Sequence, residues 1–245
     1  MTTARRRGSY GVDAPPVLFG LACTAVGMVF AGIGVTIGVG IGFGWIPFAV
    51  AALGLVSVAL YLHTTRRGKF AVWHELLGDL GLRGDERLLD LGCGRGAVLL
   101  MAAERLPEGG AVGVDLWRTV DQSGNAPEVT ERNAEAEGVR DRVELRTGDM
   151  TALPFDDASF DVIVSSLAIH NIKKAEGRTR AVDEAVRVLR PGGRLLIADI
   201  AAVDDHRRRL TELGLKDVRV RPLGWRMWWG GPWMGTRALS AVKPG

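Results

Sequence analysis

The residues best placed to do chemistry in this chain lie in one short segment, Leu88–Gly96, with the sequence LLDLGCGRG. Its apolar start is typical of a central parallel strand, and its three glycines allow a tight turn and a close approach to a ligand. Good helix formers follow Gly96, so the free N–H groups of a helix would point at that ligand. Asp90 stands at the strand end, where a carboxylate could hold an amino group and attract a sulfonium. The segment therefore predicts a nucleotide-like pocket.

Two further acidic residues follow later expected strands. A second strand over 111–115 ends in Asp115, which lies 19 residues after Gly96, the spacing at which an acidic residue binds ribose hydroxyls. A third strand over 141–145 precedes Asp149, which could accept a hydrogen bond from an adenine amine. The remaining strands are expected over 160–167, 194–200, 218–222 and 237–242. A glycine turn alone is a weak signal, and the order of these features carries the interpretation.

In this order the motifs resemble one family, the class I (Rossmann-like) methyltransferases that depend on S-adenosylmethionine (SAM). The resemblance covers the chain from about Gly68 onward and rests on the segments 90–96, 113–116, 148–149, 160–163 and 189–193. It implies an α/β fold with a seven-stranded sheet, its last strand antiparallel, and helices on both faces. It also implies SAM as cofactor and S-adenosylhomocysteine as product, with Asp90 beside the methionine moiety, Asp115 on ribose and Asp149 near adenine.

The expected cofactor contacts form one set along these strand ends. They are Asp90, Gly92, Cys93, Gly94, Gly96, Asp115, Leu116, Gly148, Asp149, Met150 and Ser165. The alternative for the aspartates is a role in capping strand ends or a place in solvated loops. The alternative for Ser165 is a buried strand hydroxyl.

An apolar segment precedes this domain, because residues 14–65 contain no Asp, Glu, Lys or Arg. A membrane-spanning helix needs about 20 apolar residues, so the segment is long enough for two. We expect helices from about 17 to 39 and from 47 to 62, with a break near 42–47 and Pro47 in the first turn of the second helix. Trp45, Tyr61 and His63 fall where interfacial side chains would lie.

The charges around the apolar segment predict its orientation. Arg5, Arg6 and Arg7 precede it, basic residues at 66, 67 and 69 follow it, and the connecting loop is uncharged. The positive-inside rule therefore places both termini and the catalytic domain in the cytoplasm, with a multi-pass hairpin in the inner or plasma membrane. A signal peptide is disfavoured because the run is too long and a second apolar segment follows. A buried soluble hairpin is disfavoured because nothing amphipathic marks a solvent face.

We therefore divide the chain into a basic cytoplasmic tail (1–13), a transmembrane hairpin (14–65), a linker helix (66–82) and the methyltransferase domain (83–245). Glycines at 34, 38 and 42, and at 40 and 44, permit close helix approach, either within the hairpin or in a homo-oligomer. The net charge of +3 is modest, and much of the positive charge flanks the apolar segment, where it would meet anionic headgroups. Neither a disulfide nor a metal site is expected, because Cys23 and Cys93 have no plausible partner and no Cys/His cluster has metal-ligand spacing.

Methyl transfer from a sulfonium is an in-line displacement, so the acceptor atom must be nucleophilic and aligned with the S–CH₃ bond. The acceptor is expected beyond the fourth and first strands, where His170 and Asn171 are the catalytic candidates. His170 could act as a base or orient the acceptor, and Asn171 could hydrogen-bond it. The alternative is that His170 packs near the cofactor as a structural residue.

Two aromatic-rich segments are candidates for acceptor binding. Trp117 could stack on adenine or cover the acceptor, and Asp121 and Asn125 are polar enough to bind it, although Asn125 is better explained as a helix N-cap before Pro127. In the tail, Trp228 stands among four tryptophans between 225 and 233. These indoles could contact the membrane interface, line the acceptor site or form a small satellite core.

The first hypothesis is an integral-membrane methyltransferase that acts on a small or lipophilic acceptor through an O, N or S nucleophile. The alternatives are a non-enzymatic SAM-binding membrane sensor, a nucleic-acid methyltransferase and an NAD-dependent oxidoreductase. Against nucleic acid, the segment 165–171 lacks the Asn/Asp-Pro-Pro-aromatic signature used on exocyclic base amines, and no basic face is interleaved with stacking aromatics. Fold and cofactor motifs do not specify the acceptor.

Overall fold

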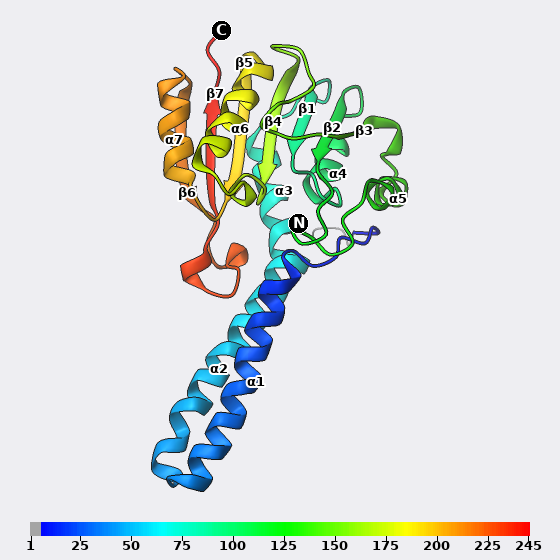
Figure 1. The fold of residues 1–245 in the computed structure, drawn as a ribbon. Coiled ribbons are helices and arrows are strands. Elements are labelled where there is room, and N and C mark those ends of the chain that lie inside the picture. The colour runs from blue at the N-terminus through cyan, green and yellow to red at the C-terminus, as the bar shows by residue number, and fades with distance from the viewer. Residues whose placement is uncertain (1–5) are drawn as a thin grey trace.

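A single sheet forms the centre of the computed structural model, which describes residues 6–245 (Figure 1). Its seven strands have the order β3-β2-β1-β4-β5-β7-β6, and β7 runs antiparallel to both of its neighbours. The α/β fold expected from the sequence is thereby confirmed. The strands are β1 (Arg87–Leu91), β2 (Gly110–Asp115), β3 (Val143–Thr147), β4 (Phe160–Ser166), β5 (Leu189–Asp199), β6 (Lys216–Pro222) and β7 (Arg237–Val242).

Helices cover both faces of this sheet because its central strands are apolar on both sides. In β1, Leu88 packs in one core cluster with side chains of α3 and α4, whereas the next residue, Leu89, packs in a second cluster with α6 and α7. This alternation is the two-residue period of a strand. The helices of this head domain are α3 (Lys69–Asp79), α4 (Ala97–Ala103), α5 (Pro127–Glu137), α6 (Ala175–Val188) and α7 (Val203–Glu212).

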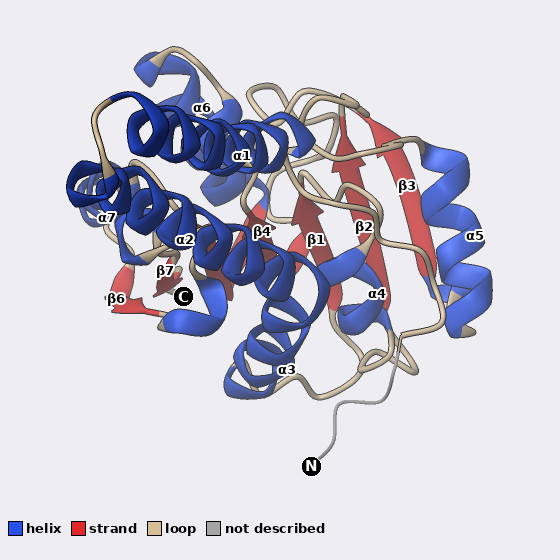
Figure 2. Cartoon of the chain, turned by 90° about the horizontal axis from the view of Figure 1, so that it is seen from below, coloured by secondary structure: helices blue, strands red, loops and turns tan. Residues whose placement is uncertain are grey.

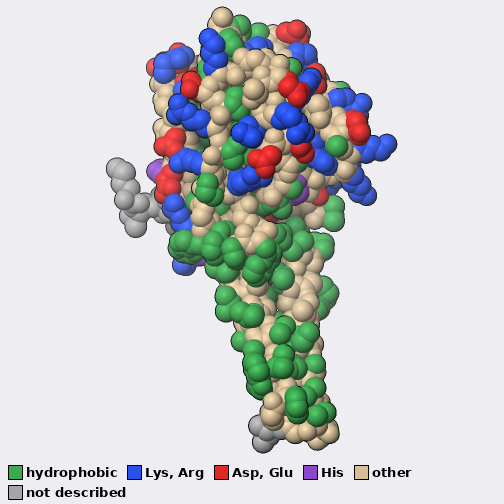
Figure 3. Space-filling view, turned by 90° about the vertical axis from the view of Figure 1, so that its left-hand side faces the viewer, with side chains coloured by type: hydrophobic (Ala, Val, Ile, Leu, Met, Phe, Trp, Pro, Cys, Tyr) green, Lys and Arg blue, Asp and Glu red, His purple; other side chains and the backbone are tan. Residues whose placement is uncertain are grey.

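Two long helices, α1 (Pro15–Gly38) and α2 (Ile41–His63), form a stalk beneath the head domain. Both are long and apolar enough to cross a membrane. Hydrophobic side chains cover the stalk, whereas Lys, Arg, Asp and Glu lie on the head domain (Figure 3). Small residues bring the two helices together, since a Cβ on Gly54 would lie 3.0 Å from the Cβ of Ala25.

The repeat of glycines at 34, 38 and 42 does not pack within this hairpin. A Cβ added at any of the three would meet nothing within 4 Å, so the expectation that these glycines serve close packing inside the hairpin is wrong. Gly44 does pack in this way, against Thr36. These three glycines are exposed, so they lie on the outer side of the hairpin, and other residues make the contacts between its helices.

The turn of the hairpin also differs from the sequence-based expectation. No break occurs near 42–47, since α2 begins at Ile41 and continues through Pro47. The chain reverses instead at Gly40, whose φ of 112° suits glycine alone. Pro47 removes only one backbone donor from the helix, and the remaining ladder carries the helix past it.

The stalk and the head domain are connected without a flexible loop. A π-helical segment, Thr64–Gly68, joins α2 directly to α3, so the two form one continuous helical rod. A Cβ on Gly68 would overlap the carbonyl oxygen of Arg226, and this places the rod directly against the tail loop between β6 and β7. The tail loop contacts the stalk again where the Trp225 indole stacks on His63.

Two further expectations need correction. The fifth strand, expected over 194–200, begins earlier, at Leu189, and ends at Asp199. Gly192 N–H donates to Lys243 O, and Lys243 N–H donates to Gly193 O. Tyr61 is not an interfacial side chain like the exposed Trp45. It is buried, and its hydroxyl donates to the carbonyl oxygen of Asp13.

The carboxyl ends of the parallel strands point toward the stalk (Figure 1). Seen from that side, α1 and α2 lie in front of the strand ends (Figure 2). Ligands of open α/β sheets collect at this edge. The fold therefore places the candidate site between the head domain and the base of the apolar hairpin.

Candidate functional site

A cavity of about 790 Å³ lies at the carboxyl ends of β1, β2 and β4, where the sequence predicts the site. Its wall combines the glycine turn and the strand ends with the first turn of α1 and the base of α2. Several sequence-predicted residues do not line it: Gly96, Trp117, Ser165 and Trp228. The predicted residues that do line it are Asp90, Gly92, Cys93, Gly94, Asp115, Leu116, Asp121, Asn125, Gly148, Asp149, Met150, His170 and Asn171.

The glycine turn is shaped by positive φ angles and by lack of space. Gly92, Gly94 and Gly96 have φ angles of 74°, 52° and 83°. A Cβ on Gly92 would overlap the Cβ of Ala168, and one on Gly94 would lie 2.5 Å from Oε1 of Gln122. A side chain at either position would therefore displace the walls of the cavity. This explains why the turn requires glycine and leaves a cradle for a ligand.

Asp90 is the unusual group in this cavity. It is 1% exposed, and its Oδ1 has no hydrogen-bond partner within residues 6–245. Burial, reinforced by the charge of Asp115, raises the pKa of the Asp90 carboxyl to about 8. A buried carboxyl oxygen without a donor is costly, so its place in the wall suggests that a ligand supplies the missing donor or positive charge.

Asp115 organises the loop that follows β2. Its Oδ2 accepts a hydrogen bond from Gly94 N–H at 2.8 Å, and its Oδ1 accepts from Trp117 N–H at 2.6 Å and from Asn125 Nδ2 at 3.2 Å. The N-cap expectation for Asn125 is wrong, since Ala126 precedes helix α5 and the Asn125 amide turns inward. A hydrogen bond from an amide to a charged carboxylate is stronger than one to a neutral backbone group at a helix end.

Three of the other expected contacts have local partners. The Trp117 indole, on a backbone with φ of 58°, donates to Thr147 Oγ1 at 2.8 Å and stays outside the cavity wall. The buried Ser165 hydroxyl donates to Leu91 O at 2.9 Å, which fits its alternative as a strand hydroxyl. Asp149 is exposed at the rim, and its Oδ1 accepts from Thr151 N–H at 2.8 Å.

His170 forms a pair with a carboxylate that the sequence analysis missed. Its Nδ1 lies 2.6 Å from Oδ1 of Asp199, the fully buried last residue of β5. The Nδ1–Oδ1 contact does not have the geometry of a hydrogen bond, whereas the backbone N–H of His170 donates to Oδ2 of Asp199 at 3.2 Å. Asp199 therefore holds the turn that carries His170. The signal in the sequence was an aspartate inside the expected fifth strand, 194–200, a position where an unpaired carboxylate would be costly.

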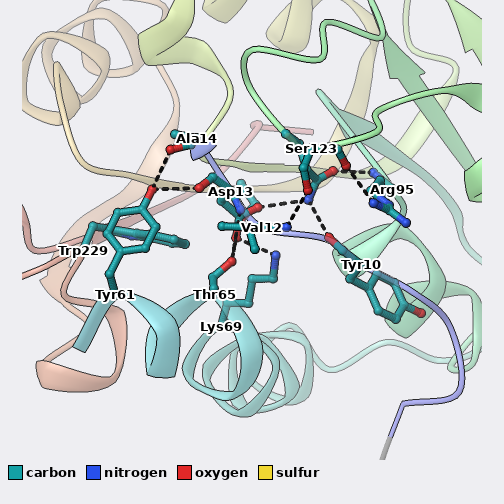
Figure 4. Close-up of polar contacts among 12 residues, drawn as sticks. Tyr10, Val12, Asp13, Ala14, Tyr61, Thr65, Lys69, Arg95, Ser123 and Trp229 are labelled. Atoms are coloured by element: carbon teal, nitrogen blue, oxygen red, sulfur yellow. Dashed lines mark hydrogen bonds and ion pairs between the residues drawn. The ribbon is translucent and has the colours of Figure 1, made fainter. Parts of the chain in front are cut away.

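Asp13, just before α1, closes the cavity on the side of the stalk (Figure 4). Its Oδ2 accepts from Lys69 Nζ at 2.7 Å and from Thr65 Oγ1 at 2.6 Å, and its Oδ1 accepts from Gln122 Nε2 at 3.0 Å. The Gln122 Oε1 in turn accepts from Arg95 N–H in the glycine turn at 2.8 Å. An unbroken chain of hydrogen bonds thus connects the helical rod to the glycine turn.

Trp229, rather than Trp228, contributes the tail loop to the cavity wall. Its indole is 3% exposed and packs edge-to-face on Tyr61, with the ring centroids 5.3 Å apart. Trp228 instead offers its carbonyl oxygen to the Thr64 hydroxyl at 2.7 Å. Neighbouring tryptophans in a loop cannot be told apart from sequence, because the loop conformation decides which one turns inward.

The segment before Asp13 packs on the head domain. Arg6 forms an ion pair with Glu104 at 2.7 Å, Ser9 N–H donates to Asn133 Oδ1, and the Tyr10 hydroxyl donates to Glu137 Oε1. Arg95 reaches the same segment through Ser9 Oγ at 3.1 Å. Of the three arginines expected before the apolar run, Arg5 lies outside the described residues.

Comparison with known proteins identifies relatives of the head domain. A family model described as "Methyltransferase domain" matches residues 89–197. A ubiquinone/menaquinone biosynthesis C-methyltransferase of Dinoroseobacter shibae is 38% identical over 135 residues, which are 55% of this chain and 50% of that protein. A demethylmenaquinone methyltransferase of Symbiobacterium thermophilum is 33% identical over 131 residues, 53% of this chain and 49% of that protein. The chain thus spans about half the length of the curated relatives it matches.

Solved structures share the fold at low sequence identity. A SAM-dependent methyltransferase from Aquifex aeolicus superposes with a TM-score of 0.55 at 17% identity and covers 69% of this chain and 88% of its own. A geranyl diphosphate methyltransferase in complex with SAM superposes with a TM-score of 0.58 at 19% identity and covers 74% of this chain and 87% of its own. These similarities concern the sheet and its helices.

The raised pKa of Asp90 predicts a pH-dependent stability of the unliganded protein. Between the ordinary carboxyl pKa of about 4 and the folded value of about 8, the folded protein holds a proton that the unfolded chain has released. Stability therefore falls as pH rises through this window. In Asp90→Asn this fall should shrink, and thermal unfolding in detergent at pH 5 to 9 measures it. The exposed Asp156→Asn is the control, and an unchanged pH profile in Asp90→Asn would contradict the assignment.

Proposed function

We propose that the chain contains a class I SAM-dependent methyltransferase domain and is an integral-membrane enzyme that methylates a lipophilic acceptor at the cytoplasmic face of the bilayer. The observation that carries the proposal is the position of the cavity. One wall is formed by the glycine turn and Asp90, and the opposite wall by the base of the apolar hairpin. Such a site can receive a water-soluble cofactor from one side and an acceptor from the lipid on the other.

The residues at the glycine turn fit SAM. The unpartnered carboxyl oxygen of Asp90 suits the amino group and the nearby sulfonium, and Gly92 and Gly94 let the turn pack against Ala168 and Gln122 beside it. Asp115 is assigned to the ribose, and Asp149 and Met150 to the adenine. SAM supplies an electrophilic methyl group on a positively charged sulfur. The other residues of the chain must then hold and activate the acceptor.

The His170–Asp199 pair is assigned to that activation. With Nδ1 beside the Asp199 carboxylate, Nε2 of His170 can accept a proton from a hydroxyl, thiol or acidic C–H of the acceptor as the new bond to the methyl carbon forms. The Asp199 carboxylate, 2.6 Å from Nδ1, stabilises the imidazolium that results. Asn171 lies in the same turn and lines the cavity, where its amide can orient the acceptor.

The membrane assignment rests on the stalk and on the charges that flank it. Two apolar helices without charged residues extend from the catalytic edge of the sheet, and Arg66, Arg67 and Lys69 stand at its head-domain end. The positive-inside rule then places the head domain in the cytoplasm, the compartment that holds SAM. Quinone-like phenols are the first acceptors to test, because the relatives named above are quinone C-methyltransferases.

A SAM-binding sensor without catalysis is the second candidate. It shares the cofactor site but requires no group for proton transfer. The position of His170 and Asn171 in the cavity wall favours the enzyme, because both side chains can reach an acceptor there. Methylation of nucleic acid is disfavoured by a site that faces the apolar stalk.

The proposal predicts SAM binding that depends on Asp90. Isothermal calorimetry on detergent-purified protein should give saturable binding of SAM and of S-adenosylhomocysteine. Asp90→Asn should weaken SAM by roughly tenfold or more, since a hydrogen bond to a charged group is lost. Asp156→Asn, on an exposed loop, should bind like the wild type. No binding by the wild type would exclude the proposed function.

The proposed topology predicts which positions a membrane-impermeant maleimide can reach from outside intact cells. In a Cys23→Ser background, a cysteine at Val39, beside the hairpin turn and 66% exposed, should be labelled. A cysteine at the exposed Arg207 on α7 should be labelled only after the cells are permeabilised. Labelling of position 207 in intact cells would contradict the orientation.

The proposed role of His170 predicts that its replacement lowers turnover without lowering the affinity for SAM. With methyl-labelled SAM and a membrane extract as the acceptor source, His170→Gln should lower the incorporated label by roughly 10²-fold or more. Asp199→Asn should lower it as well, whereas SAM affinity should hold in both variants. His74→Gln, an exposed histidine outside the cavity, is the control. Unchanged turnover in His170→Gln would remove this residue from the reaction.

A further inference from the structure

Charged side chains of both signs line the cavity, among them Arg118 and Asp121 in the loop after β2. The carboxylates of Asp90, Asp115 and Asp149 lie at the end formed by β1, β2 and the loop after β3. The opposite end, beyond β4, carries Lys173, Lys174 and Arg180. SAM has a positively charged sulfonium and amino group, so the acidic end suits it. The basic end must serve something else.

The three basic side chains at this end lack partners of opposite charge. None of Lys173, Lys174 or Arg180 forms an ion pair within 4.0 Å in the part of the chain that is described. By contrast, Lys69, also in the cavity wall, is paired with Asp13 at 2.7 Å. All three residues are exposed at the cavity, and an anion bound between them would gain from their combined charge.

The local structure directs these side chains to one place. Lys173 and Lys174 follow directly on the turn that holds His170, and α6 begins after them. Lys174 is the residue before α6, and Gly177 and Arg180 lie in its first two turns; all three line the cavity. Gly177 lets the start of α6 pack closely, because a Cβ there would lie 2.6 Å from Cγ2 of Ile172.

Beside the Asp13–Lys69 pair, the side of the cavity nearest the stalk has an apolar part. It is lined by Pro16 and Val17 of α1 and by Trp229 and Met234 of the tail loop. Val17 remains 39% exposed, so the apolar wall continues from the cavity onto the surface of the stalk. A molecule that spans this cavity thus meets basic groups beside His170 and an apolar wall that leads to the proposed bilayer.

We propose that the acceptor end of the cavity binds an amphiphile with a phosphate or carboxylate group. Lys173, Lys174 and Arg180 hold the anionic group beside His170, and the apolar part extends along Pro16, Val17 and Trp229 toward the lipid. This inference rests on the proposed function and narrows its acceptor class. It places acidic lipids and prenyl phosphates, or their carboxylate counterparts, ahead of the quinone-like phenols that the relatives bring to mind and ahead of lipid amines.

The test measures binding of a soluble probe by calorimetry on detergent-purified protein loaded with S-adenosylhomocysteine. The probes are octyl phosphate, octyltrimethylammonium and inorganic phosphate. The test variant is Lys173→Gln/Lys174→Gln/Arg180→Gln. Its matched control, Arg132→Gln/Arg207→Gln/Lys216→Gln, removes three exposed charges outside the cavity wall. Val17→Trp narrows the apolar wall.

Octyl phosphate should bind the wild type and the control variant, and the affinity should fall at least tenfold in the cavity variant. Val17→Trp should lower the affinity for octyl phosphate and leave the affinity for inorganic phosphate unchanged. Octyltrimethylammonium should not compete with octyl phosphate. Equal binding of octyl phosphate to the wild type and the cavity variant, or equally tight binding of the ammonium probe, would overturn the inference.

Two further measurements separate the alternatives. Co-sedimentation with phosphatidylglycerol vesicles measures binding to the bilayer surface. If the cavity variant loses vesicle binding but keeps its affinity for octyl phosphate, the three cations bind lipid headgroups and the proposed acceptor site is wrong. Affinity for S-adenosylhomocysteine is measured in every variant and should not change. If the wild type does not bind S-adenosylhomocysteine, the proposed function is wrong. If the wild type binds S-adenosylhomocysteine but not octyl phosphate, only this inference is wrong.

Discussion

The ion pair between Asp13 and Lys69 is the interaction on which the arrangement of this protein depends. It joins the residue before the first apolar helix to the first residue of α3, and both side chains are largely buried. Loss of one partner from a buried pair costs on the order of 3–5 kcal/mol, because the other charge is left without compensation. Through Gln122 the same carboxylate is connected to Arg95 in the glycine turn. The stalk therefore helps to position the turn, and the hairpin is more than an attachment.

A second constraint is the unmatched charge inside the cavity. Asp90 is buried beside Asp115 with one oxygen unpartnered, and the basic groups at the other end lack acidic partners. The buried carboxyl of Asp90 is unfavourable in the empty protein and becomes favourable with a ligand of opposite charge, whereas the basic groups at the other end are exposed. The buried Asp90 lowers the stability of the empty protein and raises its affinity for a positively charged ligand. The two ends of the cavity favour ligands of different charge. A cofactor and an acceptor bound at such ends would meet near His170.

The sequence was a good guide to strands and a weaker guide to side-chain partners. The motif around Asp90 and the order of the strands predicted the sheet because glycine turns and buried apolar runs are local properties. Asn125 was expected to cap a helix but bonds to Asp115, and Trp229 rather than Trp228 lines the cavity. Asp199, Asp13 and Lys69 escaped notice because their partners are distant in the chain. Helix α2 continues through Pro47 because the residues on both sides of the proline favour a helix, although proline itself disfavours one.

What the sequence alone determined is the order of the elements, the pocket at the glycine turn and the two apolar helices. These follow from the period of apolar residues, the backbone freedom of glycine and the absence of charge over 14–65, all of which act over a few residues. The tertiary structure decided that the hairpin base forms a wall of the site, that His170 lies against Asp199 and that basic and acidic groups occupy opposite ends of one cavity. Those facts depend on the distances between residues far apart in the chain, which are fixed only when the sheet and the helical rod pack together.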